Sequence, residues 1–174
     1  MAELQQSVSH TIVRSENGTD YAIQNKALGN GNFSLVYKAE IGNSGRFVAL
    51  KELKQTLGSD EEIHREIHRE IGCLRTLAHS DHIVEFIDDF VHKDDNGERK
   101  QYLVFELCEG NLKQYITRNG PLGEDQLWKL IGHMAKALKV LSDAAMIHRD
   151  IKPENILYVG LQDGSVNFKL ADMG

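Results

Sequence analysis

The sequence predicts an α+β fold in which a sheet-rich first part precedes a helical second part. Two observations carry this prediction. Short runs of aromatic and β-branched residues, separated by turn residues, dominate the first 107 positions. Beyond Gly110 the apolar residues recur at helical spacing, and two short apolar runs close the chain. The predicted order is five strands with one inserted helix, then two helices, then a small hairpin.

Composition narrows the class of protein. The 174 residues suit one domain, and 41% hydrophobic with 26% charged residues argues against a disordered chain. The net charge of −6 argues against a nucleic-acid-binding protein, which needs basic residues to neutralise phosphates. Two cysteines cannot form a disulfide framework, so we expect an intracellular protein, cytoplasmic or nuclear. No signal peptide or membrane-spanning stretch is recognised, and no oligomeric state is indicated.

The first part of the chain is predicted to be an arm followed by strands. Residues 1–20 are polar and weakly periodic, which predicts a flexible arm. Strand character begins at Tyr21, and turn residues separate the runs that follow. The predicted strands are the run from Tyr21, residues 33–40, residues 47–51, residues 83–91 and residues 101–107.

Helical spacing predicts the remaining elements. Residues 60–77 carry a slanting apolar stripe in which isoleucine and leucine recur every three or four positions. Two more segments, residues 112–117 and 124–141, show the same periodicity. A turn at residues 162–164 then separates two short apolar runs, which predicts the closing hairpin. Its strands are residues 156–159 and 166–170.

A glycine-rich turn follows the first predicted strand, in the run Leu28-Gly-Asn-Gly-Asn-Phe-Ser-Leu-Val36. Glycine lets the backbone approach a phosphate because no Cβ stands in the way. A strand follows instead of a helix, which argues against a dinucleotide-binding fold. An ordinary hairpin turn is the alternative explanation. Lys51 ends the next apolar strand, where it is either a surface lysine or a cation for phosphates bound at the turn.

The run His148-Arg-Asp-Ile-Lys-Pro-Glu-Asn155 is the most informative segment. Phosphoryl transfer needs positioning and charge neutralisation, which a base at Asp150, a cation at Lys152 and an oxygen ligand at Asn155 would supply. Asp172 adds a second carboxylate after the last predicted strand. Mg²⁺ prefers oxygen ligands, so Asn155 and Asp172 are the predicted metal ligands. A polar connector and a simple turn are the alternative interpretations of these two segments.

Taken in order, these segments resemble the eukaryotic protein kinase family. The resemblance spans residues 21–174. Ser34 replaces the third glycine of the family's loop, and Met173 replaces phenylalanine in its Asp-Phe-Gly motif. Lys152-Pro-Glu is similar to serine/threonine kinases and differs from tyrosine kinases. The matching motifs are the glycine-rich loop at residues 29–36, the strand lysine Lys51, the catalytic loop at residues 148–155 and the metal-binding motif at residues 172–174.

The resemblance implies ATP-dependent phosphoryl transfer to serine or threonine hydroxyls of a protein substrate, with Mg²⁺ as a cofactor. It implies that Asp150 accepts the hydroxyl proton and that Lys152 steadies the transferred group. It also implies that Lys51 binds the α- and β-phosphates while a helix glutamate orients it. Glu70 is preferred for that glutamate because the residues after it match the family pattern up to His79, and Glu66 is the alternative.

The same resemblance implies a nucleotide site. Gly29 and Gly31 would approach the phosphates, and the backbone groups of Glu106 and Cys108 would hydrogen-bond adenine in a hinge segment. The apolar residues implied to enclose adenine are Leu28, Val36, Ala49, Phe105 and Leu157. Asn111 stands near the position where the family often has an acid that contacts ribose, so this sequence departs from the family pattern there.

The resemblance also implies a division of the chain. After the arm at residues 1–20, we expect a kinase N-lobe at 21–107, with a five-stranded antiparallel sheet and one helix. The hinge and a partial helical C-lobe follow at 108–174. The family's activation segment would lie further on, so we expect a fragment with weak activity of its own. A nucleotide- or partner-binding fragment without turnover is the alternative, and a small-molecule kinase is disfavoured by residues 152–155.

Four histidines, His64, His68, His79 and His82, raise the question of a zinc site. No HExxH or CxxC pattern accompanies them, so a solvated helix face is the favoured interpretation.

Overall fold

The computed structural model describes residues 11–31, 34–54, 60–77, 80–94 and 96–172. The described residues divide into two compact units. The first takes residues up to 54 together with residues 88–105, and the second takes residues 60–87 together with residues 106–172. Each unit has an apolar core of its own.

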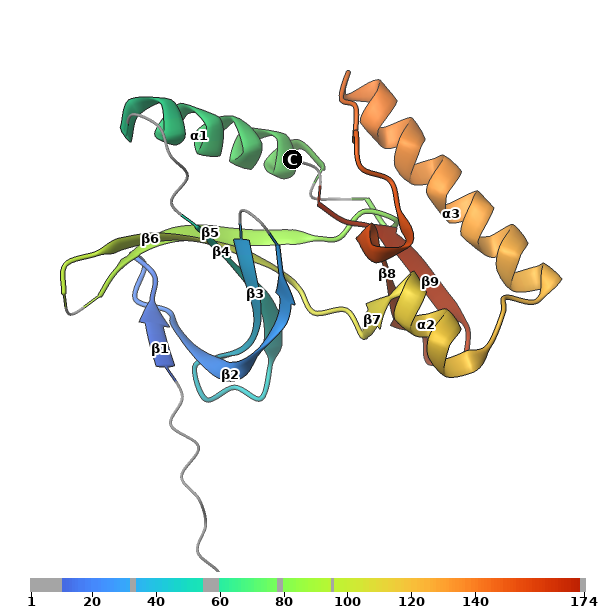
Figure 1. Cartoon of the computed structure of the whole chain (residues 1–174), viewed down its shortest axis with the longest axis horizontal. Coiled ribbons are helices and arrows are strands. Elements are labelled where there is room, and N and C mark those ends of the chain that lie inside the picture. The colour runs from blue at the N-terminus through green and yellow to red at the C-terminus, as the bar shows by residue number, and fades with distance from the viewer. Residues whose placement is uncertain (1–10, 32–33, 55–59, 78–79, 95, 173–174) are drawn as a thin grey trace, which may run out of the picture. The chain divides into compact units, whose positions relative to one another are not determined.

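The first unit is built on a six-stranded sheet with the strand order β1-β2-β3-β4-β6-β5 (Figure 1). β1 pairs antiparallel with β2, β2 with β3, and β3 with β4. The β2–β3 pairing is irregular, because its register shifts twice between Ile23 and Gly29. The strands are β1 (Thr11–Arg14), β2 (Asp20–Asn30), β3 (Ser34–Ile41), β4 (Phe47–Leu53), β5 (Phe86–Lys93) and β6 (Arg99–Glu106).

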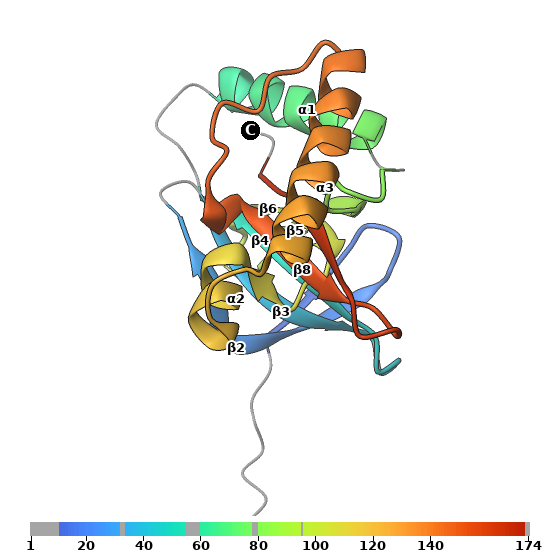
Figure 2. The same ribbon diagram turned by 90° about the vertical axis from the view of Figure 1, so that its right-hand side faces the viewer.

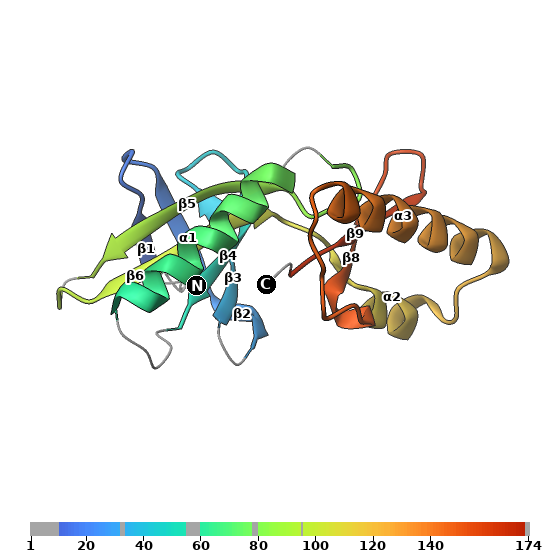
Figure 3. The same cartoon turned by 90° about the horizontal axis from the view of Figure 1, so that it is seen from above.

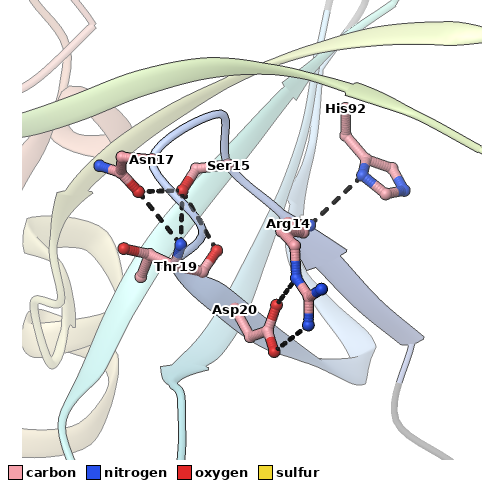
Figure 4. Close-up of polar contacts among 6 residues, drawn as sticks. All are labelled: Arg14, Ser15, Asn17, Thr19, Asp20 and His92. Atoms are coloured by element: carbon pink, nitrogen blue, oxygen red, sulfur yellow. Dashed lines mark hydrogen bonds and ion pairs between the residues drawn. The ribbon is translucent and has the colours of Figure 1, made fainter.

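The sheet curls around a core of aromatic side chains. Phe90 stacks on Tyr21 at 5.1 Å and on Tyr102 at 5.3 Å between ring centroids. The curl brings the two edge strands close to each other. The backbone N–H of Arg14 on β1 donates to Nδ1 of His92 on β5 at 3.3 Å (Figure 4). Apolar side chains from all six strands therefore share one interior.

The structure differs from the sequence prediction at β1. Residues 11–14 form a strand where a flexible arm was predicted, so the sheet has six strands and not five. Val13 is the one buried side chain of this strand, and a single buried residue leaves no alternation in the sequence to detect. The turn after β1 is held by Ser15, whose Oγ accepts the N–H of Thr19 at 3.1 Å, and by the Arg14–Asp20 ion pair (Figure 4).

The second unit combines helices with a small sheet. β7, β8 and β9 form an antiparallel three-stranded sheet in that order. The predicted helices at residues 60–77, 112–117 and 124–141 correspond to α1, α2 and α3. The elements are α1 (Asp60–Leu77), β7 (Gly110–Asn111), α2 (Leu112–Asn119), α3 (Glu124–Asp143), the 3₁₀ turn η1 (Pro153–Asn155), β8 (Ile156–Gly160) and β9 (Val166–Leu170).

One face of the small sheet forms the core of the second unit. Phe168 and Leu170 of β9 are almost fully buried, and α3 packs against this strand (Figure 3). α2 lies against β8 (Figure 2) and places Tyr115 edge-on to Tyr158 at 4.9 Å. Ile83 extends the sheet through a parallel bridge to Leu170. Among the described residues, no helix combines the length and the apolar character that crossing a bilayer requires.

Candidate active site

Lys51 projects from the face of β4 that lies opposite the core. It is directly paired with Val36 of β3, and Ala49 lies two residues earlier on the same strand. Side chains alternate along a strand, so these three side chains share one face of the sheet. The intervening Val48 and Leu50 are buried in the core. The register of two strands thus groups three of the residues that the sequence assigned to nucleotide binding.

Glu52, the neighbour of Lys51, is anchored on the opposite face of β4. The Glu52 carboxylate accepts a hydrogen bond from the Tyr102 hydroxyl at 2.9 Å and pairs with Lys100 at 3.2 Å. Burial and then Glu52 raise the pKa of Tyr102, so its hydroxyl stays protonated and donates to the carboxylate. With Glu52 held on the core face, Lys51 is directed to the other face.

The glycines of the turn are not required by the local backbone. Within the described residues neither Gly29 nor Gly31 has a φ in the left-handed region. An added Cβ at Gly29 would come no closer than 4.0 Å to Val36 Cβ, and one at Gly31 no closer than 3.7 Å to the Ser34 carbonyl. Leu28, just before them, is 53% exposed. Among the described residues, neither the backbone conformation nor a close neighbour requires glycine at these two positions, so the hairpin-turn and phosphate-binding interpretations both stand.

Glu106 is held at the start of the predicted hinge. Its carboxylate pairs with Lys169 of β9 at 2.5 Å and accepts the Glu85 N–H at 2.7 Å. Its own N–H donates to the Glu85 carbonyl at 3.0 Å and is therefore already engaged. Phe105, one residue earlier on β6, is half-buried. These contacts fix the backbone entering the hinge.

Cys108 and Leu157 lie in the second unit at partly buried positions. Burial, followed by the nearby Glu106 carboxylate, raises the pKa of the Cys108 thiol to about 12, so it is not a reactive thiolate at neutral pH. Leu157 of β8 is paired with Asn111 and Lys169, and it faces away from the core because its neighbours in β8 are buried.

The catalytic-loop residues that the sequence predicted are brought into direct contact. Lys152 Nζ donates to Asp150 Oδ2 at 2.6 Å. Asn155 Nδ2 donates to the same carboxylate oxygen and to the Asp150 carbonyl, each at 2.9 Å. The hydrogen bond from Lys152 is the main cause that lowers the pKa of Asp150, so this exposed carboxylate is ionised at neutral pH. The loop thus presents a fixed negative group to solvent.

A buried histidine ties this loop to the end of β9. His148 Nε2 lies 2.8 Å from the Ala171 carbonyl, and His148 Nδ1 lies 3.3 Å from the Asp150 N–H. A carbonyl only accepts and an amide N–H only donates, so in these two contacts Nε2 is the donor and Nδ1 is the acceptor. The Ala171 N–H in turn donates to the Asn155 carbonyl at 2.9 Å. Both polar groups of Ala171 are therefore bonded to the catalytic loop.

Asp172 follows Ala171 directly and completes the group. The hydrogen bond to Asp150 is the main cause that raises the pKa of Lys152, and the charge of Asp172 contributes to the same shift. Asn155 uses Nδ2 to hold Asp150, so Oδ1 is the atom of its amide that would serve as a metal ligand. An amide oxygen and a carboxylate are donors that Mg²⁺ accepts, and substrate phosphates usually supply further ligands. The donor set therefore fits Mg²⁺, although the described residues contain no group of three or more His, Cys, Asp or Glu side chains arranged for a metal.

Backbone strain is concentrated near these residues. Three non-glycine residues in the described part of the chain have positive φ: Ala145 at 54°, Arg149 at 69° and Asp172 at 64°. Arg149 lies inside the catalytic loop, and Asp172 is the predicted metal ligand. Left-handed backbone is costly for such residues and persists where surrounding contacts enforce it, which is common at functional sites.

Some predicted contacts are not decided by the structure. Lys51 lies in the first unit and Glu70 on α1 in the second, and their pairing stays a prediction. The Glu66 side chain and residues 173–174 lie outside what the structure describes. Of the histidines, His68 is exposed on α1, and His82 stacks on His133 at 4.3 Å.

Sequence reasoning missed two lysines that hold site residues. Lys169 pairs with Glu106, and Lys113 on α2 pairs with Glu154 of η1 at 3.0 Å. Neither lysine stands in a motif, and each is separated from its partner by more than forty residues. The sequence offers a sign of Lys169 alone, because the alternation of β9 places this lysine on the face opposite the core.

Comparison with known proteins agrees with these motifs. The family model for the protein kinase domain matches residues 22–174. The Aurora kinase of Schizosaccharomyces pombe is 37% identical over 150 residues, covering 86% of this chain and 39% of the relative. Serine/threonine-protein kinase 36 of Pongo abelii is 35% identical over 147 residues, covering 84% of this chain and 10% of the relative. Cyclin-dependent kinase 1 of Encephalitozoon cuniculi is 36% identical over 151 residues, covering 84% of this chain and 47% of the relative.

This chain spans less than half the length of each of these relatives. The matched region nevertheless contains every motif described above, from the glycine-rich turn to Asp172. The chain therefore belongs to the eukaryotic protein kinase family and resembles its serine/threonine members.

Proposed function

We propose that this chain carries the catalytic machinery of an ATP-dependent protein kinase that phosphorylates serine and threonine side chains. The observation that supports the proposal most is the network around Asp150. One carboxylate oxygen accepts hydrogen bonds from both Lys152 and Asn155, and the His148–Ala171 contact ties the residue before Asp172 to the same loop. A structural connector needs no exposed carboxylate that is fixed in this way.

Asp150 is proposed to orient the hydroxyl of the protein substrate and to accept its proton. Lys152 keeps the carboxylate ionised and is proposed to neutralise charge on the transferred phosphoryl group. A carboxylate with a lowered pKa is a weak base, so we expect its contribution to come mainly from alignment. This suits phosphoryl transfer, which depends on positioning and charge stabilisation.

Asn155 and Asp172 are proposed to hold Mg²⁺, which supplies charge neutralisation and alignment of the phosphates when it is bound. Gly29 and Gly31 are proposed to approach the phosphates, since neither φ nor a close neighbour among the described residues requires glycine there. Lys51 is proposed to bind the α- and β-phosphates, with Glu70 as its partner.

Adenine is proposed to bind to the hinge. The Glu106 N–H is engaged with Glu85, so its carbonyl is the group proposed to accept from adenine. Within the described residues the Cys108 N–H has no hydrogen-bond partner, and it is proposed to donate. The apolar side chains proposed to enclose the base are Leu28, Val36, Ala49, Phe105 and Leu157.

The test separates binding from chemistry at Asp150. Asp150→Asn should reduce the rate of phosphoryl transfer to a serine- and threonine-containing peptide library by at least about a hundredfold. It should change the affinity for a fluorescent ATP analogue with Mg²⁺ much less, because Asp150 is assigned to the hydroxyl and not to the nucleotide. Radiolabel transfer and fluorescence titration measure the two quantities.

Asp143→Asn is the matched control. Asp143 is also an exposed carboxylate paired with a lysine, Lys139, at 2.8 Å, but it lies on α3 outside the loop. Equal transfer rates in the two variants would contradict the role of Asp150. Nucleotide binding without any transfer by the unsubstituted protein would favour the second candidate, a nucleotide-binding module without turnover.

A further inference from the structure

Lys54 makes a contact that the kinase motifs do not account for. It follows β4 directly, and its Nζ donates to the Gly31 carbonyl at 2.6 Å and to Asn30 Oδ1 at 2.9 Å. The register explains how it reaches them: Ser34 is paired with Leu53, so the glycine-rich turn lies beside the end of β4. A partly exposed ammonium group is thus bonded to two acceptors of the turn.

Among the described residues of the turn, few other contacts restrain the backbone. The β2–β3 pairing is irregular up to Gly29, and Asn30 is the last residue of β2 to be paired. Beyond this pair, the Gly31 N–H donates to the Ser34 carbonyl at 2.9 Å. Residues 28–31 are all exposed. Glycine has more backbone freedom than other residues, so a turn with two of them loses more entropy when a ligand orders it.

We propose that Lys54 is a positioning residue that holds the glycine-rich turn in the conformation that receives the phosphates of ATP. The proposal rests on the proposed function, because the turn needs a nucleotide to position. By bonding the Gly31 carbonyl, Lys54 orders the turn before the ligand arrives. Less entropy is then lost on binding, which raises the affinity for nucleotide. Lys54 acts through the turn and is not assigned a contact with the phosphates.

The test measures the turn with and without nucleotide. Amide hydrogen exchange at Gly31 and Ser34 is followed by NMR in the nucleotide-free chain, and affinity is measured with a fluorescent ATP analogue and Mg²⁺. Lys54→Met should raise exchange at Gly31 and weaken nucleotide affinity, each by about fivefold, the order expected for one exposed hydrogen bond from a charged donor. Lys54→Arg keeps a charged donor and should restore most of the protection at Gly31 and most of the nucleotide affinity.

Lys26→Met is the control for net charge, since Lys26 is an exposed lysine of β2, and it should change neither quantity. Unchanged exchange at Gly31 in Lys54→Met would overturn the proposal. Weaker affinity with unchanged exchange would also overturn it and would assign Lys54 a direct phosphate contact. A third outcome is that exchange at Gly31 rises in Lys54→Met but the unsubstituted chain binds no nucleotide. The Lys54–Gly31 contact would then be real, but its role in nucleotide binding would be refuted. The proposed function would fail for the same reason.

Discussion

His148 provides the sharpest test of how the catalytic loop is held. The imidazole is only 4% exposed, and it bonds both the Ala171 carbonyl and the Asp150 N–H. His148→Ala removes both bonds and leaves the partly buried Ala171 carbonyl without its donor. We expect the free energy of unfolding to fall by about 3–4 kcal/mol: about 2 for the unsatisfied Ala171 carbonyl, less than 1 for the longer bond to Asp150, and about 1 for the cavity.

His148→Gln separates the hydrogen bond from the cavity. The glutamine amide nitrogen can take the place of Nε2 and donate to Ala171, but its Oε1 does not reproduce the position of Nδ1, so the bond from the Asp150 N–H is lost. We therefore expect the free energy of unfolding to fall by about 1 kcal/mol, which places this variant between the wild-type protein and the alanine variant. His68→Ala, at an exposed position on α1, should stay within about 0.5 kcal/mol of the wild type.

Urea unfolding at pH 7.5, followed by circular dichroism, gives the free energies. Hydrogen exchange at the Ala171 amide shows whether the loss is local, because this N–H donates to the Asn155 carbonyl. The alanine variant should lose protection there, whereas the glutamine variant should keep most of it. If both variants lost the same free energy, or if Ala171 exchange did not change, the His148–Ala171 bond would not be what holds Asp172 at the loop.

Two further predictions concern α3. Ala145 has a φ of 54° just after the helix, and its N–H bonds the Ser142 carbonyl. Ala145→Gly should stabilise the protein by about 0.5–1 kcal/mol, since left-handed backbone is costly for alanine, and a lower urea midpoint would contradict this. His133 accepts the Phe168 N–H through Nδ1, and burial, then His82 and nearby lysines, lower its pKa. The folded state thus favours neutral His133, and stability should fall as pH drops below about 6.5. His133→Asn keeps an acceptor that does not titrate and should reduce this fall; an equal fall between pH 7.5 and 5.5 in both proteins would refute the assignment.

The spacing of apolar residues was sufficient to predict a helix or strand wherever one spacing holds along the whole element. The helix predicted at residues 60–77 has the observed bounds of α1, and α3 extends the predicted helix at 124–141 by two residues. The closing strands were likewise predicted within one residue of β8 and β9. β1 was missed because Val13 is its one buried side chain, so no alternation marks it.

The sequence by itself determined which chemical groups the catalytic loop carries. Asp150, Lys152 and Asn155 stand within six residues, so their contact follows from a short loop closed by Pro153. The spacing of the loop and Asp172 also identified the family that the comparisons show.

Only the tertiary structure decided how these groups are held. His148 reaches Ala171 across 23 positions, and Lys54 reaches Gly31 across the same separation. The faces that carry Lys51 and Leu157 depend on strand register. The physical reason is that periodicity records how each segment meets solvent and core. A hydrogen bond between distant segments depends instead on where the whole chain places two backbones, and no local pattern encodes that placement.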